Sequence, residues 1–458
     1  MAASPQPLSY RPETALLELG DAFYDRVEAA DFPQTTLRFR NDRAAAEVGL
    51  DTLSDDEWVR HFGRFDPLPG TLPQPLALRY HGHQFRVYNP DIGDGRGFTF
   101  AQLRAADGRL MDLGTKGSGR TPWSRFGDGR LTLKGGVREL LATEMLEALG
   151  VTTSRTLSLI ETGEALERGD EPSPTRSAVL VRLSHGHIRI GMFQRLAYLR
   201  DADGMHRLIG YTLNRLFDET PRADAAVQLL DAVVARGARL AGQYMAAGFV
   251  HGVLNTDNIN VTGESFDYGP WRFVPSWDPG FVAAYFDHAG LYCFGRQPEA
   301  IHWDVMQLAV ALRTASDAEP LIEVLDCFGE RYTRAVCDAM LWRLGVTPRG
   351  PAEDQALVQA LEGALTATGA PIDRFFFDAF GGAIAESYVG EPYDRLRASL
   401  RDYRPRSSRD HGYWRAAEPC PMLIDEVEAI WRAIAERDDW GLLRAKLDAI
   451  AQLRAALA

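Results

Sequence analysis

The sequence has few cysteines, and the four it has form no Cys-x-x-Cys pair and no metal-like spacing. They fit buried thiols in a reducing compartment better than a disulfide framework. No apolar run approaches membrane-spanning length, and the first ten residues lack the pattern of a signal peptide. These absences argue against secreted, disulfide-rich and membrane-spanning classes, and we expect a cytoplasmic protein without a membrane partner.

Excess positive charge is also missing. The chain has 50 Lys and Arg against 63 Asp and Glu, a net charge of −13, which excludes a broad nucleic-acid footprint. One segment runs against this trend. Between residues 116 and 138, Asp128 is the single acid among six bases, and glycines are interleaved; the bases are Lys116, Arg120, Arg125, Arg130, Lys134 and Arg138. A solvated face is one reading, and backbone wrapped around an anion is the other.

The chain of 458 residues is 45% hydrophobic, enough for a large core. Residues 1–75 mix short helical patterns with proline-rich connectors and are expected to form an extension packed on the core. Residues 76–195 are mostly strand-like, and residues 196–400 are mainly helical. Residues 401–458 are expected to be a helical extension, ending in two amphipathic helices broken near 438–441.

Local patterns refine this division. Apolar residues from Val137 to Leu149 recur at helical spacing, and Gly150 sits where a glycine ends a helix. Residues 224–248 predict a second helix. Asp-Gly pairs at 94–95, 107–108 and 128–129 predict hairpin turns. The order of strands, one embedded helix, more strands and then helices predicts an α+β, protein-kinase-like bilobal fold. Its small β-rich lobe contains one key helix, and its large lobe is mainly helical.

The segment 251–258, HGVLNTDN, has the frame of a kinase catalytic loop. His251 opens it, and Asn258 stands where that loop binds metal. Val253 occupies the position of the catalytic aspartate and can accept no proton, whereas Asp257 supplies a carboxylate four places later. An Asx-rich turn after a helix is the alternative interpretation.

Residues 259–266 predict a strand, a turn and a second strand that lead to Asp267-Tyr268-Gly269. In kinases this arrangement brings a metal-binding aspartate beside the asparagine. The oxygens of Asn258 and Asp267 suit Mg²⁺, which takes its remaining ligands from phosphate and water.

A kinase-like site also needs a lysine paired with a helix glutamate. Lys116 ends a strand-like run, and Glu139 is preferred over Glu144 because it lies in the first turns of the helix. A surface ion pair is the alternative. The usual glycine-rich loop is replaced by Gly93-Asp94-Gly95-Arg96-Gly97, which offers backbone amides and a guanidinium, although a tight hairpin explains it equally well.

Arg182 and Arg189 lie seven residues apart and would face opposite sides of an uninterrupted strand. A bend at Gly186 would bring both into one cleft, where arginines grip phosphate oxygens. Two His-x-His pairs, His81/His83 and His185/His187, lack a third ligand at metal spacing and favour packing or hydrogen bonding.

Together these segments resemble the selenoprotein O family. The resemblance rests on long motifs in order, closely over about residues 15–310: HGHQF at 81–85, NPDIGDGR at 89–96, GSGRTPWSRFGDGR at 117–130, VRELLATEML at 137–146, HIRIGMF at 187–193, FDYGP at 266–270 and FGRQPEA at 294–300. The chain departs from the family at Gly135-Gly136 and in lacking the C-terminal Cys-x-x-Cys, because Cys420 stands alone.

The resemblance implies a pseudokinase fold that binds ATP in a flipped orientation and transfers AMP to Ser, Thr or Tyr hydroxyls of proteins, releasing pyrophosphate. Asp257 then matches the base, and Asn258 and Asp267 match ligands of Mg²⁺ or Mn²⁺. Lys116 matches the lysine that pairs with Glu139. The matching nucleotide contacts are Gly93, Gly95, Arg96, Lys116, Asp128, Gly129, Arg182, Arg189 and Asp267.

Two other functions stay open on the residues alone. One is an ordinary phosphotransferase acting on a protein or small molecule, which Val253 disfavours. The other is a non-catalytic, ATP-binding pseudokinase, which would have no chemical need for Lys116, Asn258 and Asp267.

Overall fold

The computed structural model describes residues 10–169 and 171–458. Within these residues, nine strands form one sheet whose main path runs β2-β4-β7-β8-β11-β10-β3, with β1 paired to β7 and β9 to β11. Every pairing in it is antiparallel. The strands are β1 (Pro12–Glu13), β2 (Tyr24–Arg26), β3 (Thr36–Arg40), β4 (Leu76–Leu78), β7 (Thr99–Arg104), β8 (Leu110–Lys116), β9 (Leu131–Thr132), β10 (Arg155–Leu166) and β11 (Thr175–Ser184).

The first 75 residues contribute directly to this sheet. The sequence predicts short helices and connectors here, and the structure adds β1, β2 and β3 to them. The short helices α1 (Asp42–Ala46) and α2 (Asp55–Phe62) follow β3. Trp58 and Phe62 of α2 are fully buried in a cluster with side chains of β7, β8 and β11. The segment therefore covers one face of the sheet as well as extending its edges.

Helix α3 (Leu133–Ala148) covers the other face, and its prediction is confirmed. The hydroxyl of Thr132 caps it by accepting from the amide of Gly135 at 3.1 Å, and Gly150 follows its end with φ 78°. Val137, Leu140 and Leu141 are buried with Leu180 of β11. Because side chains alternate along a strand, Arg182 faces the same side as Leu180, toward α3.

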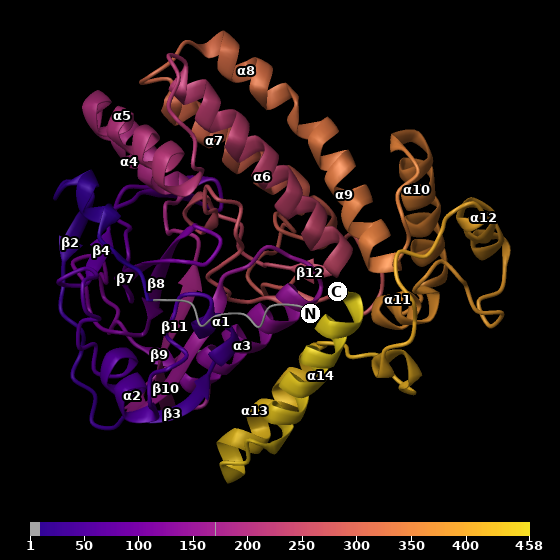
Figure 1. The fold of residues 1–458 in the computed structure, drawn as a ribbon, viewed down its shortest axis with the longest axis horizontal. Helices are drawn as coiled ribbons and strands as arrows, with labels where there is room; N and C mark the ends of the chain where they lie inside the picture. Colours follow the sequence, from indigo (N-terminus) through magenta and orange to yellow (C-terminus); the bar gives the residue numbers. More distant parts are fainter. Residues whose placement is uncertain (1–9, 170) are drawn as a thin grey trace, which may run out of the picture.

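The chain beyond residue 189 is mainly helical (Figure 1). The long helix α6 ends before Gly248, as predicted, and packs against α7 and α9. The last two helices confirm the predicted break near 438–441. The helices are α4 (Ile190–Leu199), α5 (Ala202–Tyr211), α6 (Ala225–Ala247), α7 (Gln297–Leu312), α8 (Ala318–Asp326), α9 (Phe328–Leu344), α10 (Pro351–Thr368), α11 (Ile372–Ala379), α12 (Glu391–Leu400), α13 (Ile424–Arg437) and α14 (Gly441–Leu457).

Short elements connect the sheet to these helices. The strand pairs β5 (Gly82–Gln84) with β6 (Val87–Asn89) and β12 (Phe249–Val250) with β13 (Arg272–Phe273) are antiparallel. Helical turns join them: η1 (Ala15–Leu19), η2 (Thr212–Leu216), η3 (Thr256–Asn258), η4 (Phe294–Arg296) and η5 (Gly412–Arg415).

Some local predictions were wrong. Residues 259–266 form no strands but only isolated bridges from Asn260 to Arg189 and from Ser265 to Thr153, so side-chain and loop contacts hold this segment. Of the three Asp-Gly pairs, only 107–108 closes a hairpin, between β7 and β8. The other two lie in long loops, because the strands next to them pair with distant partners.

The described residues thus form an α+β structure with a large antiparallel sheet and many helices. All four cysteines are free; three are buried, but Cys327 is exposed, contrary to the expectation of buried thiols. In the part of the chain that the structure describes, no helix is both long and apolar enough to cross a membrane.

Candidate functional site

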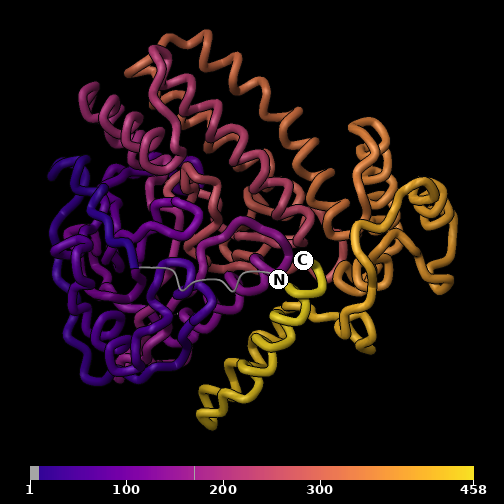
Figure 2. Tube along the Cα trace, viewed as in Figure 1, coloured from indigo at the N-terminus to yellow at the C-terminus, as the bar shows by residue number. Residues whose placement is uncertain are grey.

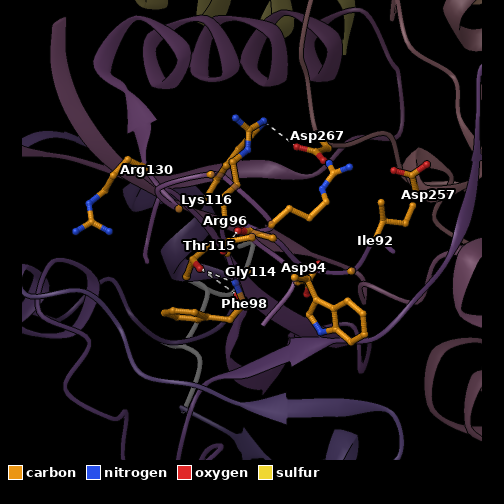
Figure 3. A pocket seen from close by; sticks show the side chains of 18 of the residues that line it. Ile92, Asp94, Arg96, Phe98, Gly114, Thr115, Lys116, Arg130, Asp257 and Asp267 are labelled. Atoms are coloured by element: carbon orange, nitrogen blue, oxygen red, sulfur yellow. Dashed lines mark hydrogen bonds and ion pairs between the residues drawn. The ribbon is translucent and has the colours of Figure 1, made fainter. Parts of the chain in front are cut away.

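A cavity of about 730 Å³ lies where the sheet meets the loops that follow α6. Residues 92–99, 114–116, 123–130 and 167–168 form most of its wall. Arg182, Arg189, Asp257 and Asp267 complete the charged lining. In Figure 3, Arg130 and Asp257 lie at opposite sides of the view, with Lys116 and Asp267 between them. Seven Lys and Arg and five Asp and Glu line it, among the residues described. This chain of net charge −13 therefore carries a cavity with a positive surplus, as a polyanion site needs.

The innermost part of the cavity is an ion-pair network around Lys116. Its Nζ lies 2.5 Å from Oε2 of Glu139 and 2.7 Å from Oδ1 of Asp267. Nη1 of Arg182 lies 3.2 Å from Oε1 of Glu139. Glu139 is the partner preferred from the sequence, whereas Glu144 contacts Arg454 and Asn41 instead. Glu139, Lys116 and Arg182 are at most 5% exposed, so little water screens their charges.

Arg182 and Arg189 converge on the same carboxylate, as the proposed bend requires. Gly186 has φ 79°, a left-handed conformation that breaks the strand. Arg182 Nη1 lies 3.8 Å from Asp267 Oδ1, and Arg189 Nη1 lies 3.9 Å from Asp267 Oδ2. Both guanidinium groups also lie over the ring of Phe266, at 5.3 and 4.8 Å.

Asp267 has both an uncommon backbone conformation and a shifted pKa. Its φ of 60° is a left-handed conformation that aspartate tolerates better than most residues. Burial alone would raise its pKa, but Lys116, Arg182, Arg189 and Arg96 together hold the pKa well below its usual range. Its side chain is 24% exposed, so the carboxylate stays ionised and accessible from the cavity.

Asp257 has the opposite electrostatics. It is 8% exposed, and its Oδ1 atom is buried without a hydrogen-bond partner among the residues described. Burial raises its pKa to about 6, although Arg189 opposes the rise. The carboxyl group packs against Gly82 of β5, where a Cβ would come within 2.9 Å of Oδ1. One cavity thus holds two carboxylates whose pKa values are pushed apart, an arrangement typical of acid–base sites.

The loop before Asp257 is fixed by His251 and Asn258. His251 is buried, burial lowers its pKa, and its Nε2 lies 3.1 Å from the carbonyl oxygen of Phe266, beside Asp267. The neutral ring therefore donates to that carbonyl. Asn258 Nδ2 donates to the carbonyl of Val253 at 3.0 Å, which leaves the Oδ1 atom of Asn258 as its acceptor. Asn258 is not among the residues that line the cavity itself.

The glycines at 93 and 95 line the cavity for a reason that sequence reasoning missed. A Cβ on Gly93 would lie 2.5 Å from the indole of Trp123, and one on Gly95 would lie 2.9 Å from the Trp123 carbonyl oxygen. The loops 93–97 and 121–124 are therefore packed directly on each other. Arg96 lines the same wall and forms no ion pair with any residue that the structure describes.

Asp128 and Gly129 lie on the cavity wall in the second of these loops. The carboxylate of Asp128 accepts from Arg168 Nη1 at 2.8 Å and from the amide of Arg130 at 2.9 Å, so it stabilises the loop. Gly129 has φ 71°, and a Cβ there would lie 2.2 Å from the carbonyl oxygen of Gly119. No other residue type fits at Gly129 without moving the backbone.

The basic segment 116–138 does not act as one group. Lys116, Arg125 and Arg130 line the cavity, whereas Lys134 and Arg138 point away toward Glu428 of α13. Helix α3 begins between them, and its turn directs the later side chains to the opposite side. The first part of the segment therefore lines the cavity, and its last two bases face α13.

Three of the four histidines in the His-x-His pairs make side-chain hydrogen bonds within the described residues, and Nε2 of His185 is buried without a partner there. Nδ1 of His81 lies 2.8 Å from the Tyr88 hydroxyl, and Nδ1 of His83 lies 2.7 Å from the Gln194 amide nitrogen. Nδ1 of His187 lies 3.3 Å from the Asp112 carboxylate. Within residues 10–169 and 171–458, no group of three or more His, Cys, Asp or Glu side chains is arranged to hold a metal.

Asp94 is the main residue that sequence reasoning missed. It is buried; Oδ2 accepts from the amide of Leu78 at 3.0 Å, and Oδ1 accepts from Arg189 Nη2 at 3.0 Å. Tyr80 lies beneath the same guanidinium, 4.5 Å from its ring centre. Asp94 stands between two glycines in a loop, and this pattern predicts a tight turn. Nothing in the pattern indicates that Asp94 pairs with Arg189.

The chain matches one family of known proteins and is similar to several curated relatives. A family described as protein adenylyltransferase SelO matches residues 6–386. A protein nucleotidyltransferase YdiU of Gloeobacter violaceus is 45% identical over 461 residues, covering 94% of this chain and 93% of the relative. The protein of the same name from Synechococcus elongatus is 52% identical over 343 residues, covering 74% and 68%. The one from Hahella chejuensis is 37% identical over 360 residues, covering 77% and 71%.

Proposed function

This chain belongs to the protein adenylyltransferase SelO family and is a nucleotidyltransferase, and from that premise we propose that it transfers AMP from ATP to hydroxyl side chains of proteins. The observation that carries the proposal is the pair of carboxylates in one positive cavity: Asp257, with a raised pKa, and Asp267, surrounded by Lys116, Arg182 and Arg189. The first suits a proton acceptor, and the second suits a metal–phosphate centre.

The frame we propose is that of a protein kinase, with the cavity between a sheet lobe and a helical lobe. The buried Lys116–Glu139 pair joins β8 to α3, as a kinase strand lysine joins its helix glutamate. The contact of His251 with the Phe266 carbonyl ties the 251–258 loop to Asp267. These contacts support the kinase-like arrangement at the level of the site.

Within this frame the nucleotide binds in reverse. Its α-phosphate lies near Asp267 and Asn258, and its β- and γ-phosphates lie against Lys116, Arg182 and Arg189. The surplus of cations on this wall supports the assignment, because pyrophosphate is the part of ATP with the most negative charge. Val253 also fits it, since the position of a kinase base is no longer next to the phosphorus that is attacked.

Asn258 and Asp267 would hold the divalent ion, Mg²⁺ or Mn²⁺. Asp267 is ionised and accessible, and the Oδ1 atom of Asn258 is left as an acceptor by the bond of Nδ2 to Val253. Two hard oxygen donors are typical of an Mg²⁺ site completed by phosphates and water. When bound, the ion would neutralise charge on the phosphates.

Asp257 would act as the general base. An acceptor Ser, Thr or Tyr hydroxyl loses its proton to Asp257, its oxygen bonds to the α-phosphorus, and the bond from that phosphorus to the bridging oxygen breaks. Pyrophosphate leaves with the electron pair. A carboxylate with a pKa of about 6 is a stronger base than an ordinary aspartate and is still ionised at pH 7.

Labelled ATP tests the proposal. The protein is incubated with Mg²⁺ and ATP labelled on either the α- or the γ-phosphate, and label on protein is counted. We expect incorporation of α-label only, abolished in Asp267→Ala and strongly reduced in Asp257→Ala. The exposed Asp410, whose side chain makes no ion pair with any described residue, supplies the matched control Asp410→Ala.

The alternatives are outcomes of the same experiment. Incorporation from γ-label only would identify a phosphotransferase and contradict the proposal. Incorporation from neither label, together with ATP binding in a calorimeter, would identify a non-catalytic ATP-binding protein. A bound ATP analogue with its γ-phosphate beside Asn258 would show that the reversed orientation is wrong.

A further inference from the structure

Helix α3 has two faces with different tasks. One face packs on the sheet through Val137, Leu140 and Leu141 and presents Glu139 to Lys116. The other face carries charged side chains that contact α13 and α14, the last two helices; these side chains are Lys134, Arg138, Glu144 and Glu147. The position of Glu139 therefore depends on contacts made behind the helix as well as on the sheet.

The first turns of α3 have little stability of their own. Gly135 and Gly136 lie there, and glycine stabilises a helix less than alanine does because more backbone entropy is lost when it is ordered. Gly136 packs closely on the sheet, since a Cβ there would lie 2.5 Å from Cδ1 of Leu159 and would displace that side chain. Lys134 and Arg138 add positive charge near the positive end of the helix dipole. The turn that precedes Glu139 thus needs support from outside the helix.

Glu428 of α13 supplies that support. Its Oε2 lies 2.7 Å from Nζ of Lys134, and its Oε1 lies 3.8 Å from Nη1 of Arg138. Burial, with the nearby Arg272, lowers the pKa of Arg138 to about 10, which makes a neighbouring carboxylate favourable. The carboxylate of Glu428 therefore balances two positive charges, one on each side of Gly135-Gly136.

The helix pair α13–α14 holds α3 at both ends and is itself anchored elsewhere. At the far end, Arg454 Nη2 lies 2.5 Å from Glu144 Oε2 and 3.3 Å from Glu147 Oε2. Asp438, between the two helices, lies 2.8 Å from Arg176 of β11. Figures 1 and 2 show the pair, in yellow, extending from beside the helical part of the chain along α3.

We propose that α13–α14 is a clamp that fixes α3, and that Glu428 is the positioning residue through which it orients the Lys116–Glu139 pair. The inference rests on the proposed function for its catalytic consequence. If α3 shifts, Glu139 leaves Lys116. Asp267, which lies 2.7 Å from Lys116, and the arginines at 96, 182 and 189 belong to other segments of the cavity wall and are not carried by α3. The cavity then still binds a triphosphate but no longer aligns it.

The test compares Glu428→Gln with Glu436→Gln, a control on the exposed side of the same helix. Among the described residues, Glu436 forms an ion pair with its neighbour Arg437 alone. Turnover and KM for ATP are measured with α-labelled ATP, and deuterium uptake is measured over residues 133–148. Since misplacement by about 1 Å can cost about 100-fold, a partial shift in Glu428→Gln should lower kcat by roughly tenfold and change KM by less than about twofold. Deuterium uptake over residues 133–148 should rise in Glu428→Gln. Glu436→Gln should change neither kcat nor deuterium uptake.

A second variant separates positioning from general destabilisation. Lys134→Met removes the same contact from the other side, so Lys134→Met/Glu428→Gln should lose no more turnover than the worse single variant. Additive losses, or unchanged kcat and uptake in Glu428→Gln, would overturn the clamp. If the wild type incorporates no label, the proposed function fails instead, and the deuterium uptake of Glu428→Gln alone decides whether α3 is clamped.

Discussion

Replacing Asp257 by asparagine should make the protein more stable and inactive at once, and the gain should depend on pH. In the fold the pKa of Asp257 is raised from 3.8 to about 6. The native state therefore disfavours the ionised carboxylate. The energetic cost is absent below about pH 3.8, grows between 3.8 and 6, and is complete above pH 6. Because one pH unit corresponds to about 1.4 kcal/mol, the full cost is roughly 3 kcal/mol.

Asparagine has the shape of the protonated acid and cannot ionise, so Asp257→Asn should recover this free energy above pH 6. At about 2.1 cal/mol/K per residue, unfolding 458 residues has an entropy of roughly 1 kcal/mol/K, so the melting temperature should rise by about 3 °C at pH 8. At pH 4 the gain should nearly vanish. Calorimetry on Asp257→Asn and on the exposed control Asp410→Asn at both pH values measures this. An equal shift at pH 4 and pH 8, or a loss of stability at pH 8, would refute the reasoning.

Three further outcomes are expected. If Asp257 is the base, kcat/KM for α-label transfer should rise with pH to a plateau with a midpoint near 6, and a flat profile from pH 5 to 8 would argue against that role. Glu139→Gln leaves the buried cations of Lys116 and Arg182 without their shared carboxylate, so the free energy of unfolding measured by urea titration should fall by about 3 kcal/mol. A fall of less than about 1 kcal/mol would mean that Asp267 alone balances the two cations. Gly129→Ala places a Cβ 2.2 Å from the Gly119 carbonyl oxygen and should weaken ATP binding in calorimetry, whereas Gly108→Ala, in a hairpin turn with open space around it, should leave binding unchanged.

The parts of the fold that could be predicted are those set by local spacing. In the helix that contains Val137 and Leu141, apolar residues recur every three or four positions, and a glycine follows the last turn. Both patterns involve only residues that are close in the sequence. The same holds for the hairpin at Asp107-Gly108. Membership of the first 75 residues in the sheet could not be found this way, because β3 pairs with β10 more than a hundred residues later and nothing local encodes that partner.

The predictions for 259–266 failed for a related physical reason. Alternating residues such as Ile259 and Val261 have the pattern of a strand, but they are buried by contacts with the 188–190 segment and make only an isolated bridge there. Asn260 and Thr262 are buried as well, and burial on both sides removes the difference between two faces that alternation along a half-buried strand reports. The alternation therefore indicated neither which side chains are inside nor which backbone hydrogen bonds hold the segment.

In the candidate site, the cations and the Lys116–Glu139 pair were predictable, but the partner of Arg189 was not. Arg189 is recognisable because a bend at Gly186 is the simplest way to bring it to Arg182, and bend and convergence are both present. Its fixation by Asp94 was hidden, because an aspartate between two glycines fits a turn equally well until the fold brings residues 94 and 189 within 3.0 Å. The difference matters for function. A guanidinium held by Asp94, by the Asp257 carbonyl oxygen at 3.0 Å and over Tyr80 is oriented before any ligand arrives, so little rotamer entropy is lost when it contacts a phosphate. Asp94, the Asp257 carbonyl and Tyr80 thus prepare the cavity for a polyanion by orienting Arg189, although none of them is basic. A count of basic residues in the sequence cannot reveal this contribution.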